Sequence, residues 1–202
     1  MTEQIPVVDF RFGDKWFITD FITPFNPSIM EIAEAFPKTD DTVILDVAEY
    51  IRDSYSYPFN SMGEPACNSQ LCNAEFFPNF PAFQYSIFRM YAWDFPAETV
   101  ITKSGYCAET AHLMCSILRN RGLNAYVCLG AVLNPVGEVL GYHAWVKCML
   151  KGQWYVCETT IHEPNIQNLI PMGDLYTGRL DVTYREDCYY NESEFRGEYF
   201  ED

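Results

Sequence analysis

The alternation of apolar and polar residues predicts helices in the first half of the chain. Between residues 39 and 55, apolar side chains recur every three or four positions, which is the spacing of one helix face. This stripe consists of Ile44, Val47, Ala48, Ile51 and Tyr55. Either Thr39 or Asp40 can cap the helix. A shorter helix is expected over residues 26–36, because that segment opens with an Asn-Pro pair suited to a helix start.

The second half starts with the strongest helical pattern in the sequence and continues as strands. Residues 106–121 have helical periodicity, and Gly122 then provides a typical helix end. Three runs with strand character follow, over residues 124–133, 142–150 and 153–161. Only Lys-Gly separates the last two runs, which is a hairpin connection. We therefore expect an α+β fold in which a helix precedes an antiparallel sheet.

The segment between these halves predicts less regular structure. Residues 58–81 are interrupted by Pro58, Gly63, Pro65, Pro78 and Pro81. Such a segment is expected to be a long irregular loop, and long loops often form the wall of a binding cleft. Residues 82–93 have weak helical character, and a short capped helix is expected to begin at Asp94.

Length and composition fit one domain with a substantial core. The chain has 202 residues, of which 49% are hydrophobic. We interpret residues 1–202 as a single domain, with the best-supported core at 93–160. Residues 1–38 are then an N-terminal extension, and residues 189–202 are expected to form an acidic, solvated tail.

The charge narrows the possible partners. The formal net charge is −15, which repels nucleic-acid phosphates and anionic lipids, so neither nucleic acid nor membrane is expected as a partner. No apolar run reaches the roughly 18 residues that a membrane span needs. The sequence starts without a secretory pattern, and its eight cysteines fit free thiols in the cytoplasm. The oligomeric state is left open.

Two cysteines and a histidine in the segment GYCAETAHLMC raise the question of chemistry. The helix wheel predicts one buried stripe, formed by Cys107, Ala111, Met114, Cys115 and Leu118. His112 lies off this stripe among polar positions, so the three residues do not form a metal site, and we expect no metal and no cofactor. Cys115 is expected to be a packing residue. Cys107 is either a small apolar residue or a reactive thiolate favoured by the positive helix end.

A reactive cysteine needs a base and a group that orients the base. If Leu150 pairs with Gln153 across the Lys-Gly turn, His143 and Glu158 point to the same sheet face as diagonal neighbours. If the helix packs on that face, Cys107 meets both of them. The thiol would then attack, the imidazole would carry the proton, and the carboxylate would orient the ring.

Alternatives remain for each of these residues. A lone histidine or glutamate on a strand usually has only a structural role. His162 has the same parity as Glu158, but its strand is expected to end before Pro164. Cys67 and Cys72 could form a metal or disulfide staple, although no second pair lies nearby.

The chain resembles the transglutaminase-like superfamily of papain-type cysteine enzymes over two segments, SGYCAETAHLMCSILRNRGLNAYVCLGAV and GYHAWVKCMLKGQWYVCETT. The resemblance extends from about Trp93 to Thr160. It implies a core in which the nucleophile helix packs on an antiparallel sheet. It also implies Cys107 as nucleophile, His143 as base and Glu158 as the acidic third residue, a position most often occupied by aspartate in the family.

The activity implied by this resemblance is acyl transfer from an amide through a thioester. With water as acceptor, the protein would be a cysteine protease or amidase that hydrolyses peptide or isopeptide bonds of a peptide or protein substrate. With an amine as acceptor, it would be a cross-linking transamidase. A third reading is a non-catalytic module that binds peptides or proteins. An oxyanion hole would use the backbone N–H of Cys107 and a second donor from Gln84, Tyr91 or Trp93.

Overall fold

The computed structural model describes residues 6–9, 14–38, 42–57, 93–160, 169–172, 176–177 and 182–197.

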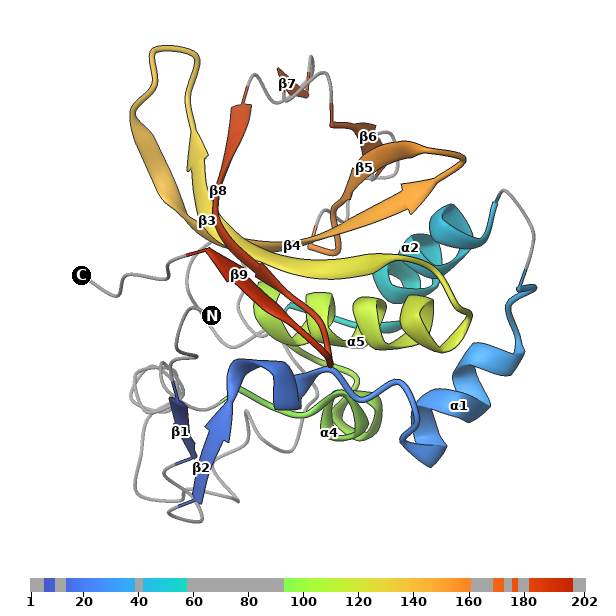
Figure 1. Cartoon of the computed structure of the whole chain (residues 1–202). Coiled ribbons are helices and arrows are strands. Elements are labelled where there is room, and N and C mark those ends of the chain that lie inside the picture. The colour runs from blue at the N-terminus through green and yellow to red at the C-terminus, as the bar shows by residue number, and fades with distance from the viewer. Residues whose placement is uncertain are drawn as a thin grey trace.

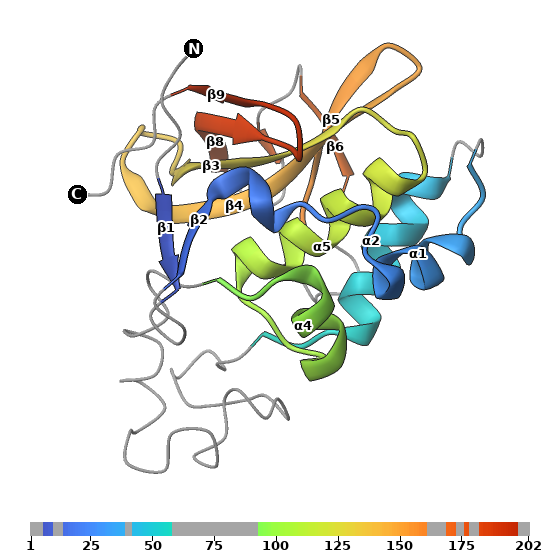
Figure 2. The ribbon, with the colours of Figure 1, turned by 60° about the horizontal axis from the view of Figure 1, so that its bottom comes forward.

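Helices form one layer of the molecule and an antiparallel sheet forms the other (Figures 1 and 2). The helical elements are the short 3-10 helix η1 (Ile18–Phe21), α1 (Pro27–Glu34), α2 (Val43–Ser54), α4 (Pro96–Thr102) and α5 (Cys107–Asn120). α5 lies centrally, against the other helices on one side and the sheet on the other (Figure 2). The expected α+β fold is therefore confirmed.

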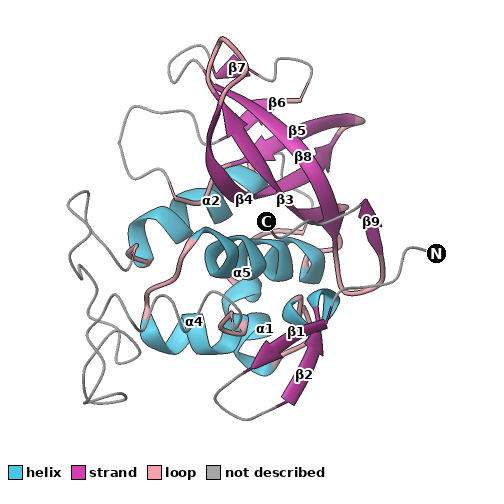
Figure 3. Cartoon of the chain, turned by 90° about the vertical axis from the view of Figure 1, so that its left-hand side faces the viewer, coloured by secondary structure: helices cyan, strands magenta, loops and turns pink. Residues whose placement is uncertain are grey.

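The main sheet has the strand order β6-β5-β4-β3-β8-β7, and β9 also pairs with β8. Its strands are β3 (Ala125–Leu133), β4 (Val139–Leu150), β5 (Gln153–Cys157), β6 (Leu169–Pro171), β7 (Tyr176–Thr177), β8 (Val182–Tyr190) and β9 (Phe195–Gly197). A separate two-stranded sheet joins β1 (Pro6–Asp9) to β2 (Asp14–Phe17) beside the helical layer (Figure 3).

The first two predicted helices are confirmed, α1 by its cap and α2 by its buried face, although the N-cap of α2 is Thr42 and not Thr39 or Asp40. The Asn26 side chain accepts a hydrogen bond of 3.0 Å from the backbone N–H of Ser28 at the start of α1. Every residue of the predicted α2 stripe is buried. Thr39 and Asp40, as well as the loop 58–81, lie outside the described residues.

The hairpin that joins β4 to β5 has the predicted register, with Leu150 opposite Gln153. The two turn residues, Lys151 and Gly152, both have positive φ angles, of 50° and 81°. Two consecutive positive φ values make the turn that matches the twist of adjoining strands. The pairing of Leu150 with Gln153, from which the position of His143 relative to Glu158 was inferred, is therefore correct.

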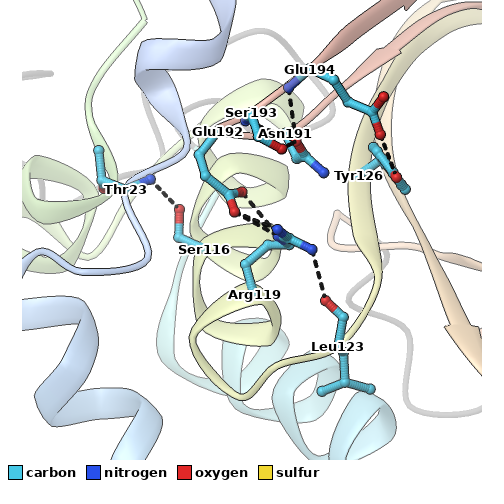
Figure 4. A network of polar contacts seen from close by, with 9 residues as sticks. All are labelled: Thr23, Ser116, Arg119, Leu123, Tyr126, Asn191, Glu192, Ser193 and Glu194. Atoms are coloured by element: carbon cyan, nitrogen blue, oxygen red, sulfur yellow. Dashed lines mark hydrogen bonds and ion pairs between the residues drawn. The ribbon is translucent and has the colours of Figure 1, made fainter.

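The prediction that His112 faces away from the core was wrong, because α5 is buried on every side. His112 is fully buried, and its Nε2 lies 2.6 Å from the Tyr190 hydroxyl. The ring also stacks on Phe21, with centroids 5.4 Å apart. The polar face of α5 is covered by segments that offer hydrogen bonds, such as the Thr23 N–H that donates to Ser116 Oγ (Figure 4).

The acidic end was expected to be a solvated tail, and this expectation is wrong for residues 189–197. They complete β8 and form β9. Glu192 accepts two hydrogen bonds, of 2.9 and 3.0 Å, from Arg119 Nε on α5, and the Tyr126 hydroxyl donates to Glu194 (Figure 4). The acidic side chains of this segment therefore bind it to α5 and β3. The rest of the tail lies outside the described residues.

Candidate active site

His143 and Glu158 form a close polar pair in the site. His143 is on β4, and Glu158 is the first residue after β5. The imidazole Nε2 lies 3.0 Å from one oxygen of the carboxylate and 3.1 Å from the other. The His143 side chain is 17% exposed and that of Glu158 only 2%. The carboxylate is thus hidden behind the ring, while the ring retains access to solvent.

Cys107 is the first residue of α5 and is half-buried. The preceding N–H group, that of Tyr106, donates to the carboxylate of Glu109 at 2.9 Å, which completes a capping interaction at this end of the helix. The first N–H groups of a helix point out of its end and carry partial positive charge, so the thiol lies at the positive end of α5. Cys115, by contrast, is fully buried, and burial raises the pKa of its thiol.

The electrostatic environment keeps the His143 ring positively charged at neutral pH. Burial alone lowers the pKa of His143. The charge of Glu158 and hydrogen bonds with Cys107 and Glu158 outweigh burial, and together they raise this pKa to about 10. The imidazole therefore interacts with the thiol and with the carboxylate at once.

The three residues come together differently from the expected way. The β4 side chains that pack with α5 are Ala144 and Val146, while Trp145 belongs to a second apolar cluster with Tyr184. Because strand side chains alternate, His143 points to the Trp145 face, opposite to α5. The condition that α5 packs on the His143 face is therefore not met. Pairing between β4 and β5 stops at Val146 and Cys157. His143 lies in the part of β4 that precedes this pair, and there its ring forms a hydrogen bond with the Cys107 thiol.

Tyr184 is a site residue that the sequence did not reveal. It lies on β8, with its ring 5.1 Å from that of Trp145 and 6.5 Å from that of His143. Burial, followed by the charge of Glu158 and a hydrogen bond to it, raises the pKa of the Tyr184 phenol. The hydroxyl therefore donates to the same carboxylate that contacts His143, and it helps to fix the position of that carboxylate.

A buried pair of hydroxyl groups joins α5 to the segment that follows β5. Thr110 Oγ1 and Thr159 Oγ1 are 2.8 Å apart. Thr110 also donates to the backbone carbonyl of Tyr106, at 3.0 Å. Since Thr110 is one turn from Cys107 and Thr159 follows Glu158, this contact fixes the distance between the nucleophile helix and the acidic residue.

An open pocket of about 350 Å³ lies beside the imidazole, and we call it the His143 pocket. Its described lining consists of Val132, Leu140, Gly141, Tyr142, His143, Glu158, Thr160, Val182 and Tyr184. Apolar and aromatic side chains form most of its walls. His143 and Glu158 are thus both part of a concave surface that a ligand can reach.

Several of the candidates from the sequence lie outside the residues that the structure describes. Those outside the described residues are Cys67, Cys72, Gln84, Tyr91 and His162. Trp93 is described, and its ring packs on Phe21 and His112 with centroid distances of 5.5 and 5.0 Å. Within the described part of the chain, no group of three or more His, Cys, Asp or Glu could hold a metal ion. No helix described there is long and apolar enough to cross a membrane.

Comparison with protein families places this site in a known core. Residues 82–159 match the model described as the transglutaminase-like superfamily. Over these residues the chain is similar to the transglutaminase-like superfamily. The matched residues include Cys107, His143 and Glu158, so the three candidates lie within the matched segment. The comparison with curated proteins found no match.

Solved structures similar to the chain are distant in sequence. A protein from Cytophaga hutchinsonii, described as a candidate cysteine protease, is 17% identical, with 82% of this chain and 49% of that protein covered and a TM-score of 0.44. The chain thus spans about half the length of that protein. LapG from Legionella pneumophila is 10% identical, with 95% and 88% covered and a TM-score of 0.49. Its calcium-bound form is 11% identical, with 83% and 73% covered and a TM-score of 0.48.

Proposed function

We propose that this chain is a thiol-dependent acyl-transfer enzyme that hydrolyses amide bonds of a peptide or protein. In this proposal Cys107 is the nucleophile, His143 transfers the proton, and Glu158 orients the imidazole. The observation that supports it most strongly is the position of His143, whose charged ring interacts with the thiol and with the buried carboxylate. A histidine with only a structural role needs neither contact with a thiol at a helix start nor access to an open pocket.

The two ring nitrogens of His143 have separate tasks in this mechanism. Nε2–H donates to Glu158, which leaves Nδ1 for the exchange of a proton with Cys107. The charged imidazole stabilises negative charge that develops on the Cys107 sulfur during the reaction, because opposite charges attract each other in a partly buried site. Glu158 in turn fixes the ring orientation, and its charge offsets the cost of the buried imidazolium.

Acylation follows from this arrangement. The thiolate attacks the carbonyl carbon of the amide, and the backbone N–H of Cys107 donates to the oxyanion that forms. The amide nitrogen takes the proton from Nδ1 of His143, the C–N bond breaks, and the free amine leaves. The acyl group then remains on Cys107 as a thioester.

Deacylation reverses the proton transfer with water in place of the amine. Nδ1 accepts a proton from the attacking water, and the oxygen bonds to the carbonyl carbon. The thiolate is expelled as the carboxylic acid product forms, and the imidazolium is restored beside it.

The proposal is tested with p-nitrophenyl acetate, an activated ester that needs no knowledge of the natural substrate. The wild-type protein should release about one equivalent of p-nitrophenolate in a rapid burst and gain one acetyl group on Cys107. Cys107→Ala should abolish the burst, and His143→Ala should slow it by roughly 10²-fold or more. Peptide mapping by mass spectrometry identifies the acetylated thiol.

Cys115→Ala is the matched control, because it removes a thiol from the same helix at a fully buried position. This variant should keep the burst amplitude of the wild type. A burst that survives in Cys107→Ala, or an acetyl group found mainly on another cysteine, would contradict the proposed nucleophile.

A further inference from the structure

We propose that the His143 pocket binds an apolar side chain on the amine side of the amide bond, next to the bond that is broken. This inference rests on the proposed function and adds the class of substrate to it. The amine part of the substrate should therefore begin with a large apolar or aromatic residue, such as phenylalanine or leucine.

The position of the pocket relative to the reacting groups assigns the side of the bond. His143 and Glu158 line the pocket, whereas Cys107 is not among the described lining residues. During acylation the acyl carbon bonds to the thiol, while the leaving nitrogen takes its proton from His143. Groups attached to that nitrogen must therefore lie on the imidazole side of the site, where the pocket opens.

The walls of the pocket determine what it can accept. Val132, Leu140 and Val182 provide aliphatic surface, and Tyr142 and Tyr184 provide aromatic surface. The one carboxylate in the described lining is that of Glu158, and its interactions with His143 and the Tyr184 hydroxyl are already made. An apolar side chain can lose contact with water here without leaving a buried polar group unpaired, while an acidic side chain would be repelled.

Exposed apolar residues continue from the pocket along the hairpin of β3 and β4, which extends away from the helical layer (Figure 1). Leu140 and Tyr142 are 61% and 63% exposed although both line the pocket. Val136 and Val139, on the same hairpin, are 78% and 48% exposed. Leu140 and Tyr142 are large apolar side chains that line a pocket and are still open to water, which marks a binding surface rather than a core. A volume of about 350 Å³ lies at the small end of the range of ligand sites.

Competition between amines for the acyl-enzyme tests this inference. The acetyl thioester is formed from p-nitrophenyl acetate, and phenylalaninamide, leucinamide, glycinamide or aspartic acid amide is added at equal concentration. The amine attacks the thioester carbon and gives up a proton, the C–S bond breaks, and an N-acetylated amide is released with the free thiol. The ratio of N-acetylated product to acetate, measured by liquid chromatography, reports how well the pocket holds each amine.

Phenylalaninamide and leucinamide should capture at least about tenfold more acetyl groups than glycinamide, since one apolar group in a pocket changes rates by this order. Aspartic acid amide should capture fewer than glycinamide. Leu140→Asp should reduce the advantage of phenylalaninamide to a few-fold. Val136→Asp is the matched control, because it adds the same charge to the same hairpin outside the described pocket lining. It should keep the full advantage of phenylalaninamide and the burst of the wild type.

The outcomes separate the two proposals. If the wild type gives no burst, the proposed function is wrong and this inference falls with it. If the burst occurs but glycinamide and phenylalaninamide are captured equally, this inference alone is wrong. An equal loss of discrimination in Leu140→Asp and Val136→Asp would also overturn it, because the effect would then come from charge on the hairpin rather than from the pocket.

Discussion

Replacing Glu158 with glutamine removes the charge that keeps His143 protonated, while leaving the size of the side chain nearly unchanged. In the wild type the charge of Glu158 is the largest of the influences that raise the pKa of His143. Without it, burial is the dominant influence, and burial lowers the pKa. The His143 pKa in Glu158→Gln should therefore fall from about 10 toward or below its ordinary value of 6.5.

The size of the effect follows from the shift itself. A rise from 6.5 to about 10 corresponds to roughly 5 kcal/mol in favour of the charged ring. Since the folded-state pKa lies above the unfolded one, this stabilisation is fully present below about pH 6.5 and is lost as the pH rises to about 10. The free energy of unfolding of the wild type should thus exceed that of Glu158→Gln most at pH 6 and least near pH 10.

Two measurements check this prediction. Urea unfolding at pH 6 and pH 9.5 gives the difference in free energy of unfolding at each end of the range. The burst rate with p-nitrophenyl acetate gives the effect on chemistry, and it should fall by roughly 10²- to 10⁴-fold at pH 7 because the base loses its orientation and charge. Titration of the His143 ring by NMR follows the pKa directly.

Glu186→Gln is the matched control for Glu158→Gln. Glu186 also accepts hydrogen bonds from a cationic side chain of β4, with Lys147 Nζ 2.8 and 2.9 Å from its oxygens, but it has no contact with His143. It should affect stability without changing the His143 titration. The reasoning is refuted if Glu158→Gln retains a His143 pKa near 10 and a burst rate within twofold of the wild type.

Two further variants test the surroundings of the site. Tyr184→Phe removes a hydroxyl that donates to Glu158, so the burst rate should fall by about three- to tenfold, as one hydrogen bond to a charged group is lost. The exposed Tyr142→Phe should not slow the burst, and equal rates for the two variants would contradict the role of Tyr184. Gly130→Ala should lower the free energy of unfolding by several kcal/mol, because its Cβ would lie 1.9 Å from a backbone oxygen of β8. Gly141→Ala on the adjacent strand meets no atom within 4 Å, and urea unfolding should show a difference of at least about 2 kcal/mol between the two.

Local signals in the sequence were sufficient to predict the elements that carry the candidate site. Asn26 and the Asn-Pro start predicted α1, and Gly122, with a φ of 85°, ends α5 as expected. The two-residue turn set the register of β4 and β5, and the shared face inferred from it agrees with the contact between His143 and Glu158. Each of these inferences involves residues that are close in sequence, where backbone geometry and side-chain alternation dominate.

The features that the sequence did not predict depend on contacts between distant parts of the chain. The sequence of β8 does not predict a strand, because Arg185, Glu186 and Asp187 interrupt its apolar residues. A register shift near Gly130 also breaks the alternation of inward and outward side chains between β3 and β8. Tyr184 could not be assigned to the site without that strand. Likewise, a helix wheel assigns one face of α5 to solvent. In the structure this face is covered by η1 and β8, which come from opposite ends of the chain, and Tyr190 of β8 contacts His112 there.

The central claim is that His143 activates the Cys107 thiol, and alkylation by iodoacetamide at pH 6 tests it most directly. The wild type and His143→Ala are treated in parallel, and the modification of Cys107 is followed over time by peptide mapping. The two proteins present the same cysteine at the same helix start, so accessibility changes little while the neighbouring charge is lost. The account predicts that Cys107 reacts at least about tenfold faster in the wild type. Rates within twofold of each other would contradict it.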